Sequence, residues 1–244
     1  MTTLAVIPAR LGATRLPRKP LRLLGGAPLI VRVWERLTAL ALVDRVVVAT
    51  DSDEVARTAR DAGAECVLTD PRHPSGTDRV AEITRKPEFA SYEVIVNVQG
   101  DEPFLPAEAT RGALELVASG AFPLGTAAVP APAAGLGAPD GVKVVRADDG
   151  RALYFSRAGI PFLRDDAERS ERDAMILQHL GIYAYTRDAL ARWVALPPHP
   201  LERVERLEQL RPLAAGMAIG DAVLDDAAPR GIDTEEDLRL ANDR

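Results

Sequence analysis

The sequence has few of the residues that mark a secreted or membrane protein. It holds one cysteine among 244 residues, which excludes an internal disulfide framework and a thiolate zinc cluster. This residue, Cys66, lies in the apolar run AECVLT and is expected to be a packed thiol. No stretch approaches the roughly 20 apolar residues that span a bilayer, and the run LAVI near the N-terminus is too short for a signal peptide. We therefore expect a cytoplasmic protein without a membrane segment.

Positive charge is also scarce overall, yet it is concentrated in one place. The chain has 30 Lys and Arg against 36 Asp and Glu, a formal net charge of −6. Binding to a nucleic-acid backbone needs a broad basic face, so we expect no nucleic-acid partner. The segment AVIPARLGATRLPRKPL (5–21) nevertheless gathers Arg10, Arg15, Arg18 and Lys19. This clustering indicates a small anionic ligand, with a solvated loop of incidental cations as the alternative.

The hydrophobic pattern predicts strands alternating with helices. Apolar, β-branched runs predict strands at 4–9, 45–51 and 93–101, and apolar residues at helical spacing predict helices at 28–40 and 53–63. Alternating strands and helices are typical of a mostly parallel, Rossmann-like α/β sheet flanked by helices. We therefore expect a single mixed α/β domain over 1–244.

The second half of the sequence departs from this alternation. Asp149-Gly150 joins two β-rich runs within 142–157, which predicts an added antiparallel hairpin in a subregion at about 125–185. Helices are expected at 200–213 and 234–243, the second opening with a capping-box-like Thr234 and Asp237. The Pro-, Gly- and Ala-rich stretch 127–141 is the expected mobile loop.

Polar residues follow the predicted strands, where ligands bind in open α/β sheets. The loop after the first strand matches neither G-x-G-x-x-G nor the P-loop spacing, but its cations suit a polyphosphate. Ser75-Gly76-Thr77 precede a helical pattern and either present backbone N–H groups to a ligand or simply cap the helix. After the third strand, Asp101 and Glu102 offer carboxylates of the kind that Mg²⁺ binds together with phosphate oxygens.

Eight motifs, in order and over nearly the whole chain, resemble the 3-deoxy-manno-octulosonate cytidylyltransferase family, whose members are also called CMP-KDO synthetases. They are IPARLGATRLPRKPL, VVVATDSDEV, HPSGTDRVAE, VNVQGDEP, VKVV with ALYFSRAGIPF, QHLGIYAY, PLERVERLEQLR and GIDTEEDL. The resemblance implies transfer of CMP from CTP to the anomeric hydroxyl of 3-deoxy-D-manno-octulosonate (KDO), with release of pyrophosphate. It also implies that the α/β domain over 1–244 has the nucleotidyltransferase fold, with Mg²⁺ as cofactor, a homodimer and a role in lipopolysaccharide biosynthesis.

The resemblance assigns roles to individual residues. CTP would be bound by Pro8, Ala9, Arg10, Arg15, Lys19, Ser75, Gly76, Thr77 and Gln99. Asp101 and Asp233 would ligate metal, and Lys19, Arg15 and Asp101 would act in catalysis. The sugar acid would contact Arg157, His179, Tyr183, Glu208 and Gln209. Without the resemblance, His179 would be interpreted as a structural histidine, and Glu208 and Gln209 as the solvated flank of a helix.

Three residues depart from the family pattern. Arg18 replaces the Gly of LPGKPL, Asp78 replaces the Glu of SGTER, and Gln178 stands where the family often has Lys or Arg. The last change leaves another sugar acid, such as sialic acid, as an alternative acceptor. For the dimer interface we expect the hairpin and apolar face around 142–162.

Two further functions remain open from the sequence. Asp51-Ser52-Asp53 resembles the Asp-x-Asp metal site of a glycosyltransferase, although capping of the next helix explains it better. The other alternative is a nucleotide-binding protein without turnover.

Overall fold

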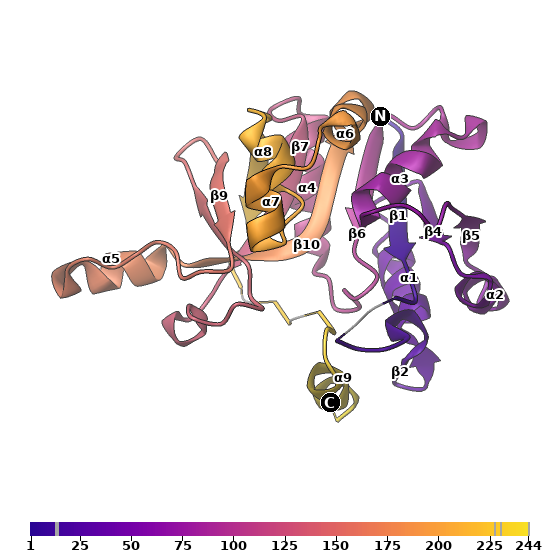
Figure 1. The fold of residues 1–244 in the computed structure, drawn as a ribbon, viewed down its shortest axis with the longest axis horizontal. Helices are drawn as coiled ribbons and strands as arrows, with labels where there is room; N and C mark the ends of the chain where they lie inside the picture. Colours follow the sequence, from indigo (N-terminus) through magenta and orange to yellow (C-terminus); the bar gives the residue numbers. More distant parts are fainter. Residues whose placement is uncertain (13–14, 227, 230, 244) are drawn as a thin grey trace. The chain divides into compact units, whose positions relative to one another are not determined.

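The computed structural model describes residues 1–12, 15–226, 228–229 and 231–243. The chain divides into two compact units, which we describe separately. The first comprises Met1–Ala107 and Pro229–Arg244, and the second Glu108–Ala228 (Figure 1). No helix in the described ranges is long and apolar enough to cross a membrane.

The first unit is built on a parallel sheet with strand order β6-β1-β4-β5. These strands are β1 (Thr3–Ala9), β4 (Arg45–Thr50), β5 (Glu65–Leu68) and β6 (Val94–Val98). β1 lies between β4 and β6 and runs parallel to both. All five residues of β6 are buried, as expected for a strand covered on both faces. The three predicted strands are confirmed, but the third ends at Val98, so Gln99 and Asp101 follow the sheet rather than belong to it.

Most helices described for the first unit begin at a capping side chain. The helices are α1 (Leu29–Leu40), α2 (Asp53–Asp61), α3 (Gly76–Arg85) and α9 (Glu235–Asn242), with 3-10 turns at Lys19–Leu21 and Pro87–Phe89 and a small hairpin of β2 (Leu23–Leu24) and β3 (Ala27–Pro28). Ser52 accepts a hydrogen bond from the amide of Val55 (3.3 Å) and caps α2. The predicted capping box of Thr234 and Asp237 opens α9.

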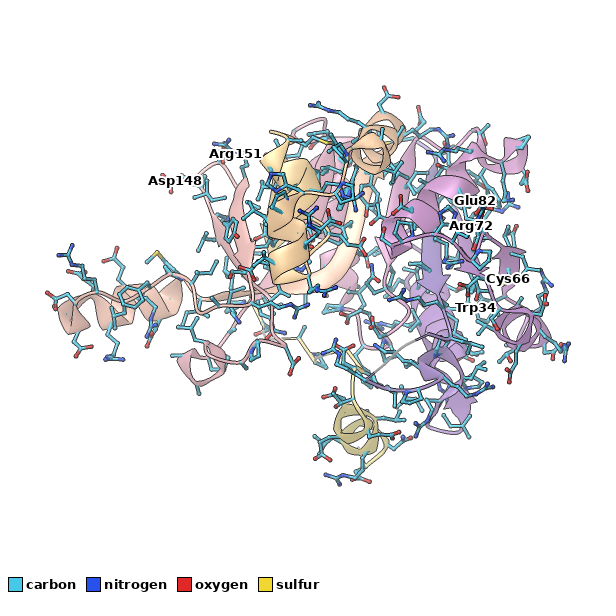
Figure 2. The ribbon with its side chains drawn as sticks, viewed as in Figure 1. Trp34, Cys66, Arg72, Glu82, Asp148 and Arg151 are labelled. Carbon is cyan, nitrogen blue, oxygen red and sulfur yellow. The ribbon has the colours of Figure 1, made fainter. Side chains whose placement is uncertain are left out.

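The second unit supplies the antiparallel element. Its strands are β7 (Leu124–Pro130), β8 (Lys143–Arg146), β9 (Ala152–Ser156), β10 (Leu177–Thr186) and β11 (Ile219–Val223). β7 pairs antiparallel with β10 and parallel with β11, while β8 pairs antiparallel with β10 and β9. The β8–β9 hairpin is the predicted one; Figure 2 shows Asp148 and Arg151 at its tip. The predicted α/β class, a parallel core with an added antiparallel element, is confirmed.

Five helices are described for the second unit, and one prediction there is wrong. They are α4 (Ala107–Ala118), α5 (Arg169–Ala174), α6 (Arg187–Ala195), α7 (Pro200–Glu205) and α8 (Leu210–Ala214), with 3-10 turns at Ala133–Gly135 and Asp166–Glu168. The single helix expected over 200–213 is two helices, because Arg206 adopts a left-handed conformation (φ 54°) that ends α7. Glu208 and Gln209 therefore lie in the turn between two helices rather than on a helix flank.

The expected loop over 127–141 is also shorter than predicted. Its first four residues belong to β7, which continues to Pro130 and is buried up to Val129. Alanines such as Ala127 and Ala128 have a low strand propensity, and pairing of this segment with β10 and β11 overrides it.

Candidate active site

The predicted nucleotide-binding segments of the first unit meet at the carboxyl ends of β1 and β6. A β-carbon built on Gly76 would lie 3.2 Å from Cγ of Pro8 and 3.7 Å from Oε1 of Gln99. One built on Gly100 would lie only 2.9 Å from the backbone oxygen of Pro8, closer than real side chains allow. Glycine is therefore required at position 100 for this close approach. The structure thus brings together three segments that are separated by many residues in the sequence.

The Ser75-Gly76-Thr77 segment forms the start of α3. The Ser75 hydroxyl accepts from the amide of Asp78 (3.2 Å) and also contacts the Asp78 carboxylate (2.6 Å). The capping interpretation is therefore correct. It is compatible with ligand binding, because a capped helix start still directs other first-turn N–H groups outward, where the helix dipole favours an anion.

Two carboxylates from distant parts of the chain hold one ammonium group. The Lys19 nitrogen lies 2.7 Å from Oδ2 of Asp101 and 2.6 Å from Oδ1 of Asp233. Arg15 approaches the other oxygen of Asp233 at 3.0 Å. Asp233 is placed here because the amide of Ile232 donates to the backbone oxygen of Asp101 (2.8 Å). The residues predicted for catalysis and for metal binding thus form one cluster.

The protonation of Lys19 follows from this environment. Burial alone would lower the pKa of Lys19, but the charges and hydrogen bonds of Asp101 and Asp233 outweigh it and raise the pKa above its ordinary value. The side chain therefore stays an ammonium ion at physiological pH. A fixed positive charge at this position suits phosphate binding.

The chemistry of the Asp101 and Asp233 carboxylates bears on whether they can hold a metal ion. No group of three or more His, Cys, Asp or Glu converges on a common point in the described part of the chain. Mg²⁺, however, typically takes one or two carboxylates and completes its shell with water and substrate phosphate oxygens. Asp101 and Asp233 supply two oxygen donors that already share a cation, Lys19. The donor set therefore fits Mg²⁺.

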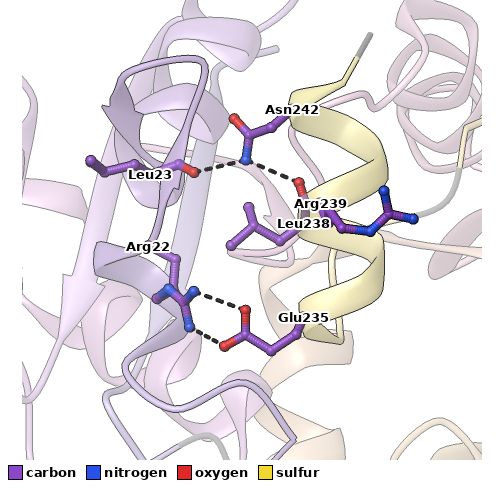
Figure 3. A pocket seen from close by; sticks show the side chains of 6 residues that line it. All are labelled: Arg22, Leu23, Glu235, Leu238, Arg239 and Asn242. Carbon is purple, nitrogen blue, oxygen red and sulfur yellow. Dashed lines mark hydrogen bonds and ion pairs between the residues drawn. The ribbon is translucent and has the colours of Figure 1, made fainter.

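Helix α9, which follows Asp233 in the chain, helps to fix its position. The helix residues Glu235, Leu238, Arg239 and Asn242 line a pocket of about 410 Å³ together with Arg22 and Leu23. Figure 3 shows these side chains next to the β2–β3 hairpin. Arg22 forms a two-pronged ion pair with Glu235, with one bond of 2.8 Å, and Asn242 accepts from the amide of Gly25 (2.8 Å). Leu238 packs in a buried cluster with Leu16, Leu24, Leu29 and Ile232. These contacts anchor the segment that carries Asp233.

Two other cations of the basic loop have different surroundings. Arg10 is exposed and makes no ion pair within the described ranges, so it can contact a ligand phosphate. Arg18 takes the left-handed conformation (φ 57°) that explains why glycine is common there, and its guanidinium pairs with Glu54 of α2. The Arg18 guanidinium is therefore directed to Glu54.

The Asp51-Ser52-Asp53 segment has a structural partner. The guanidinium of Arg79, which is 3% exposed, lies 2.9 Å from the Asp51 carboxylate and also contacts the Thr69 hydroxyl. Ser52 and Asp53 form the cap and first residue of α2. Asp51 is thus committed to a largely buried ion pair, which argues against an Asp-x-Asp metal site.

In the second unit, the predicted sugar-acid residues of β10 belong to an aromatic group in which Tyr183 is buried and His179 is partly exposed. His179 lies edge-on to Phe155 with ring centroids 5.1 Å apart, and 5.3 Å from the Tyr183 ring. Burial lowers the pKa of His179 to about 3, so the imidazole is neutral. Burial, together with Tyr185, Glu208 and Asp221, raises the pKa of Tyr183, which keeps its hydroxyl protonated.

Arg157 is held on several sides. Its backbone amide donates to the Glu205 carboxylate (2.9 Å), and its guanidinium donates to the backbone oxygens of Glu205 (2.8 Å) and Pro139 (2.9 Å). Because a guanidinium carries five N–H groups, this leaves donors for a ligand. The buried Gln209 and the partly buried Glu208 complete the predicted set in this unit.

Sequence reasoning missed the residues that support this set. Glu205 accepts from Ser156 (2.6 Å) as well as from Arg157. Lys143 is 2% exposed and donates to the backbone oxygens of Ala138 (2.8 Å), Gly141 (2.5 Å) and Arg157 (2.7 Å). A lysine inside the apolar run VKVV was a signal for a buried, satisfied cation. Glu205 gave no such signal.

The comparisons with known proteins define the class of this chain. A sequence profile described as "Cytidylyltransferase" matches residues 4–219. The chain is therefore a nucleotidyltransferase of the cytidylyltransferase family.

Relatives define the particular family. A protein of Gemmatimonas aurantiaca named 3-deoxy-manno-octulosonate cytidylyltransferase is 59% identical over 242 residues, covering 99% of this chain and 93% of that protein. One of Polynucleobacter necessarius subsp. necessarius with the same name is 47% identical over 96% of this chain and 92% of its own length. This chain belongs to the 3-deoxy-manno-octulosonate cytidylyltransferase family.

A solved structure extends the agreement to the fold. The structure of CMP:2-keto-3-deoxy-manno-octonic acid synthetase complexed with CTP superimposes with a TM-score of 0.90 at 38% identity, covering 100% of this chain and 98% of the other. The family expected from the eight motifs is confirmed.

Proposed function

We propose that this protein transfers CMP from CTP to the anomeric hydroxyl of KDO, releasing pyrophosphate and forming CMP-KDO. The observation that carries the proposal is the cluster of Lys19, Asp101 and Asp233, with Arg15 beside it, at the carboxyl end of β6. It combines cations suited to a triphosphate with carboxylates suited to Mg²⁺. Family membership specifies the nucleotide and favours KDO over sialic acid as acceptor.

The proposed chemistry needs no covalent enzyme intermediate. The anomeric oxygen of KDO forms a bond to the α-phosphorus of CTP, and the bond from that phosphorus to the pyrophosphate oxygen breaks. Such transfers depend chiefly on positioning and charge stabilisation, and orientation alone can contribute roughly 7–11 kcal/mol. Lys19 and Arg15 would stabilise the charge on the leaving pyrophosphate, together with the exposed Arg10. This assigns CTP to the residues of the first unit.

The sugar acid is assigned to the second unit. Arg157 would use its remaining guanidinium donors on the KDO carboxylate, while Tyr183, His179, Glu208 and Gln209 would contact its hydroxyl groups. Gln178 contributes no charge, so Arg157 is the cation that the proposal relies on for the carboxylate. Replacing Arg157 by Lys would lose the planar geometry that matches a carboxylate.

We propose Mg²⁺ as the cofactor, held by Asp101 and Asp233. When bound, it would neutralise phosphate charge and so lower the repulsion between anionic nucleotide and anionic sugar. The proposal also places the reaction in the cytoplasm, where CTP is available, and its product in lipopolysaccharide biosynthesis.

The first experiment measures pyrophosphate release from CTP and Mg²⁺ with KDO, with sialic acid and without a sugar. Release only with KDO is expected. Release only with sialic acid would keep the chemistry and change the acceptor. CTP binding without release under any condition would favour the nucleotide-binding protein without turnover.

The matched control pair is Asp101→Asn and Asp53→Asn. The first removes a proposed metal ligand and should reduce the rate by about 10²-fold or more. The second changes a carboxylate of the Asp-x-Asp segment and should leave the rate unchanged. The reverse pattern would support the glycosyltransferase alternative.

We further propose a homodimer through the face around 142–162. Phe162 is 84% exposed, and Leu153 of the hairpin is exposed as well. Large apolar side chains grouped on a surface commonly mark protein contacts. Light scattering should show a dimer, and Leu153→Ser with Phe162→Ser should yield a folded monomer; a monomeric wild-type protein would contradict the proposal.

A further inference from the structure

The hydrogen bonds of one buried threonine restrict the chemistry of His179. Thr126 of β7 is fully buried, and its hydroxyl oxygen lies 2.6 Å from the backbone oxygen of Ile182 and 2.8 Å from Nε2 of His179. Ile182 lies where the pairing of β10 with β7 shifts its register, between His179 and Tyr183. A carbonyl oxygen only accepts hydrogen bonds, so the single hydroxyl hydrogen of Thr126 must point to Ile182.

This assignment determines which nitrogen of the imidazole carries hydrogen. Because the Thr126 hydrogen is used on Ile182, its oxygen can only accept from His179, and Nε2 must therefore carry a hydrogen. In the opposite tautomer Nε2 is an acceptor, and the single Thr126 hydrogen can serve either Nε2 or the Ile182 oxygen. The other of these two atoms would then face the lone pair of the Thr126 oxygen at hydrogen-bond distance. Since a buried polar group without a partner is costly, the Nε2–H form is the one that satisfies both contacts.

The rest of the environment keeps the ring neutral and in place. The aromatic rings of Phe155 and Tyr183 flank the imidazole, and burial disfavours its charged form. The backbone amide of His179 donates to Val142 (2.8 Å). Within the described residues, Nε2 is the ring nitrogen with a hydrogen-bond partner. Nδ1 is therefore an acceptor that can receive a hydrogen bond from a ligand.

We propose that Thr126 is a positioning residue that fixes His179 as its Nε2–H tautomer, so that Nδ1 accepts a hydrogen bond from a hydroxyl of the sugar acid. The role toward the sugar rests on the proposed function, whereas the tautomer does not. His179 then selects for a donor at this position of the acceptor. A neutral acceptor cannot pair with the KDO carboxylate, which separates its role from that of Arg157.

The tautomer is tested by nitrogen-15 NMR of the histidine side chains. The chain has three histidines, and the signals that disappear in His179→Asn identify the ring. We expect a protonated Nε2 and an unprotonated Nδ1, unchanged between about pH 5 and pH 8. A protonated Nδ1 in the wild-type protein, or titration of the ring in this range, would overturn the proposal.

The role toward the sugar is tested with two variants at one position. Thr126→Val keeps the volume but removes the hydroxyl, and should give mixed tautomers and raise the KM for KDO roughly tenfold, with the KM for CTP unchanged. Thr126→Ser keeps the hydroxyl and should resemble the wild type. Equal KM values for KDO in the two variants would overturn the role.

The tautomer of His179 and its role toward the sugar acid are tested independently. If the wild-type protein releases no pyrophosphate with KDO, the proposed function and the sugar-acid role of Nδ1 are both wrong. The tautomer is still decided by the spectrum of the wild-type protein, which requires neither activity nor a stable Thr126→Val variant.

Discussion

The ammonium nitrogen of Lys19 lies 2.7 Å from a carboxylate oxygen of Asp101, so a proposed metal ligand already holds a cation that belongs to the protein. Asp233 contacts the same nitrogen at 2.6 Å. A divalent cation that binds these carboxylates must therefore compete with Lys19 or share them with it.

This competition predicts that Lys19→Gln binds Mg²⁺ more tightly than the wild type when no nucleotide is present. Without the ammonium, two carboxylates repel each other until a metal ion neutralises them. At a Mg²⁺ concentration about tenfold above Kd, the Tm of the variant should rise by roughly 3–6 °C, and that of the wild type by less.

Thermal unfolding against Mg²⁺ concentration makes this measurement. The control is Lys86→Gln, because Lys86 pairs with Glu82 away from the cluster. Equal Mg²⁺ responses in Lys19→Gln and the wild type would contradict assignment of the metal to this pair.

Arg18 combines a left-handed backbone conformation with an exposed ion pair. A non-glycine residue at φ 57° costs roughly 1–2 kcal/mol, whereas the exposed pair with Glu54 contributes about 0–1 kcal/mol. Arg18→Gly should therefore leave the free energy of unfolding unchanged or raise it by about 1 kcal/mol. Arg18→Ala keeps the strain and should be no more stable than the wild type.

Urea unfolding measures the free energy of unfolding of Arg18→Gly and Arg18→Ala. The KM for CTP should be the same in both variants. A large rise in that KM for Arg18→Gly would instead show that the guanidinium leaves Glu54 to bind a phosphate.

The ion pair of Asp51 with Arg79 predicts a structural rather than a catalytic role. Breaking a buried pair from one side typically costs 3–5 kcal/mol, and because Asp51 is partly exposed we expect about 2–3 kcal/mol for Asp51→Asn. The variant should retain Mg²⁺-dependent activity at temperatures where it stays folded. Loss of activity with an unchanged free energy of unfolding would favour a metal-binding Asp51.

The buried carboxylate of Asp221 should make the free energy of unfolding depend on pH. Its carboxylate on β11 is 2% exposed, neither oxygen has a hydrogen-bond partner in the described structure, and burial raises its pKa to about 6 even though Arg146 acts in the opposite direction. The folded protein therefore binds this proton more tightly than the unfolded chain, whose pKa is near the ordinary 3.8. The resulting stabilisation is full below the unfolded pKa and is lost as the pH rises through about 6.

Asp221→Asn removes this titration and should be more stable than the wild type at neutral pH. The difference in free energy of unfolding should grow by roughly 1–2 kcal/mol between about pH 4.5 and about pH 7.5. Urea unfolding at both pH values measures it; a difference that does not change with pH would show that Asp221 titrates normally.

Local patterns in the sequence correctly indicated the parallel strands, the hairpin at Asp149-Gly150 and the capping box of α9. Each of these depends on residues a few positions apart. The helix expected over 200–213 failed because its apolar spacing is continuous, while the break at Arg206 comes with contacts from Ser156 and Arg157 to Glu205. Those contacts join residues almost fifty positions apart, so no local pattern reports them.

The same distinction holds for the site. The sequence by itself determined the family, because eight ordered motifs carry the residues proposed to bind nucleotide, metal and sugar acid. Only the tertiary structure decided how these residues act: that Lys19 lies between Asp101 and Asp233, that Arg18 faces Glu54, and that Thr126 sets the hydrogen on His179. Charge and hydrogen-bond partners depend on distances of a few ångströms between segments far apart in the chain, and folding alone sets those distances.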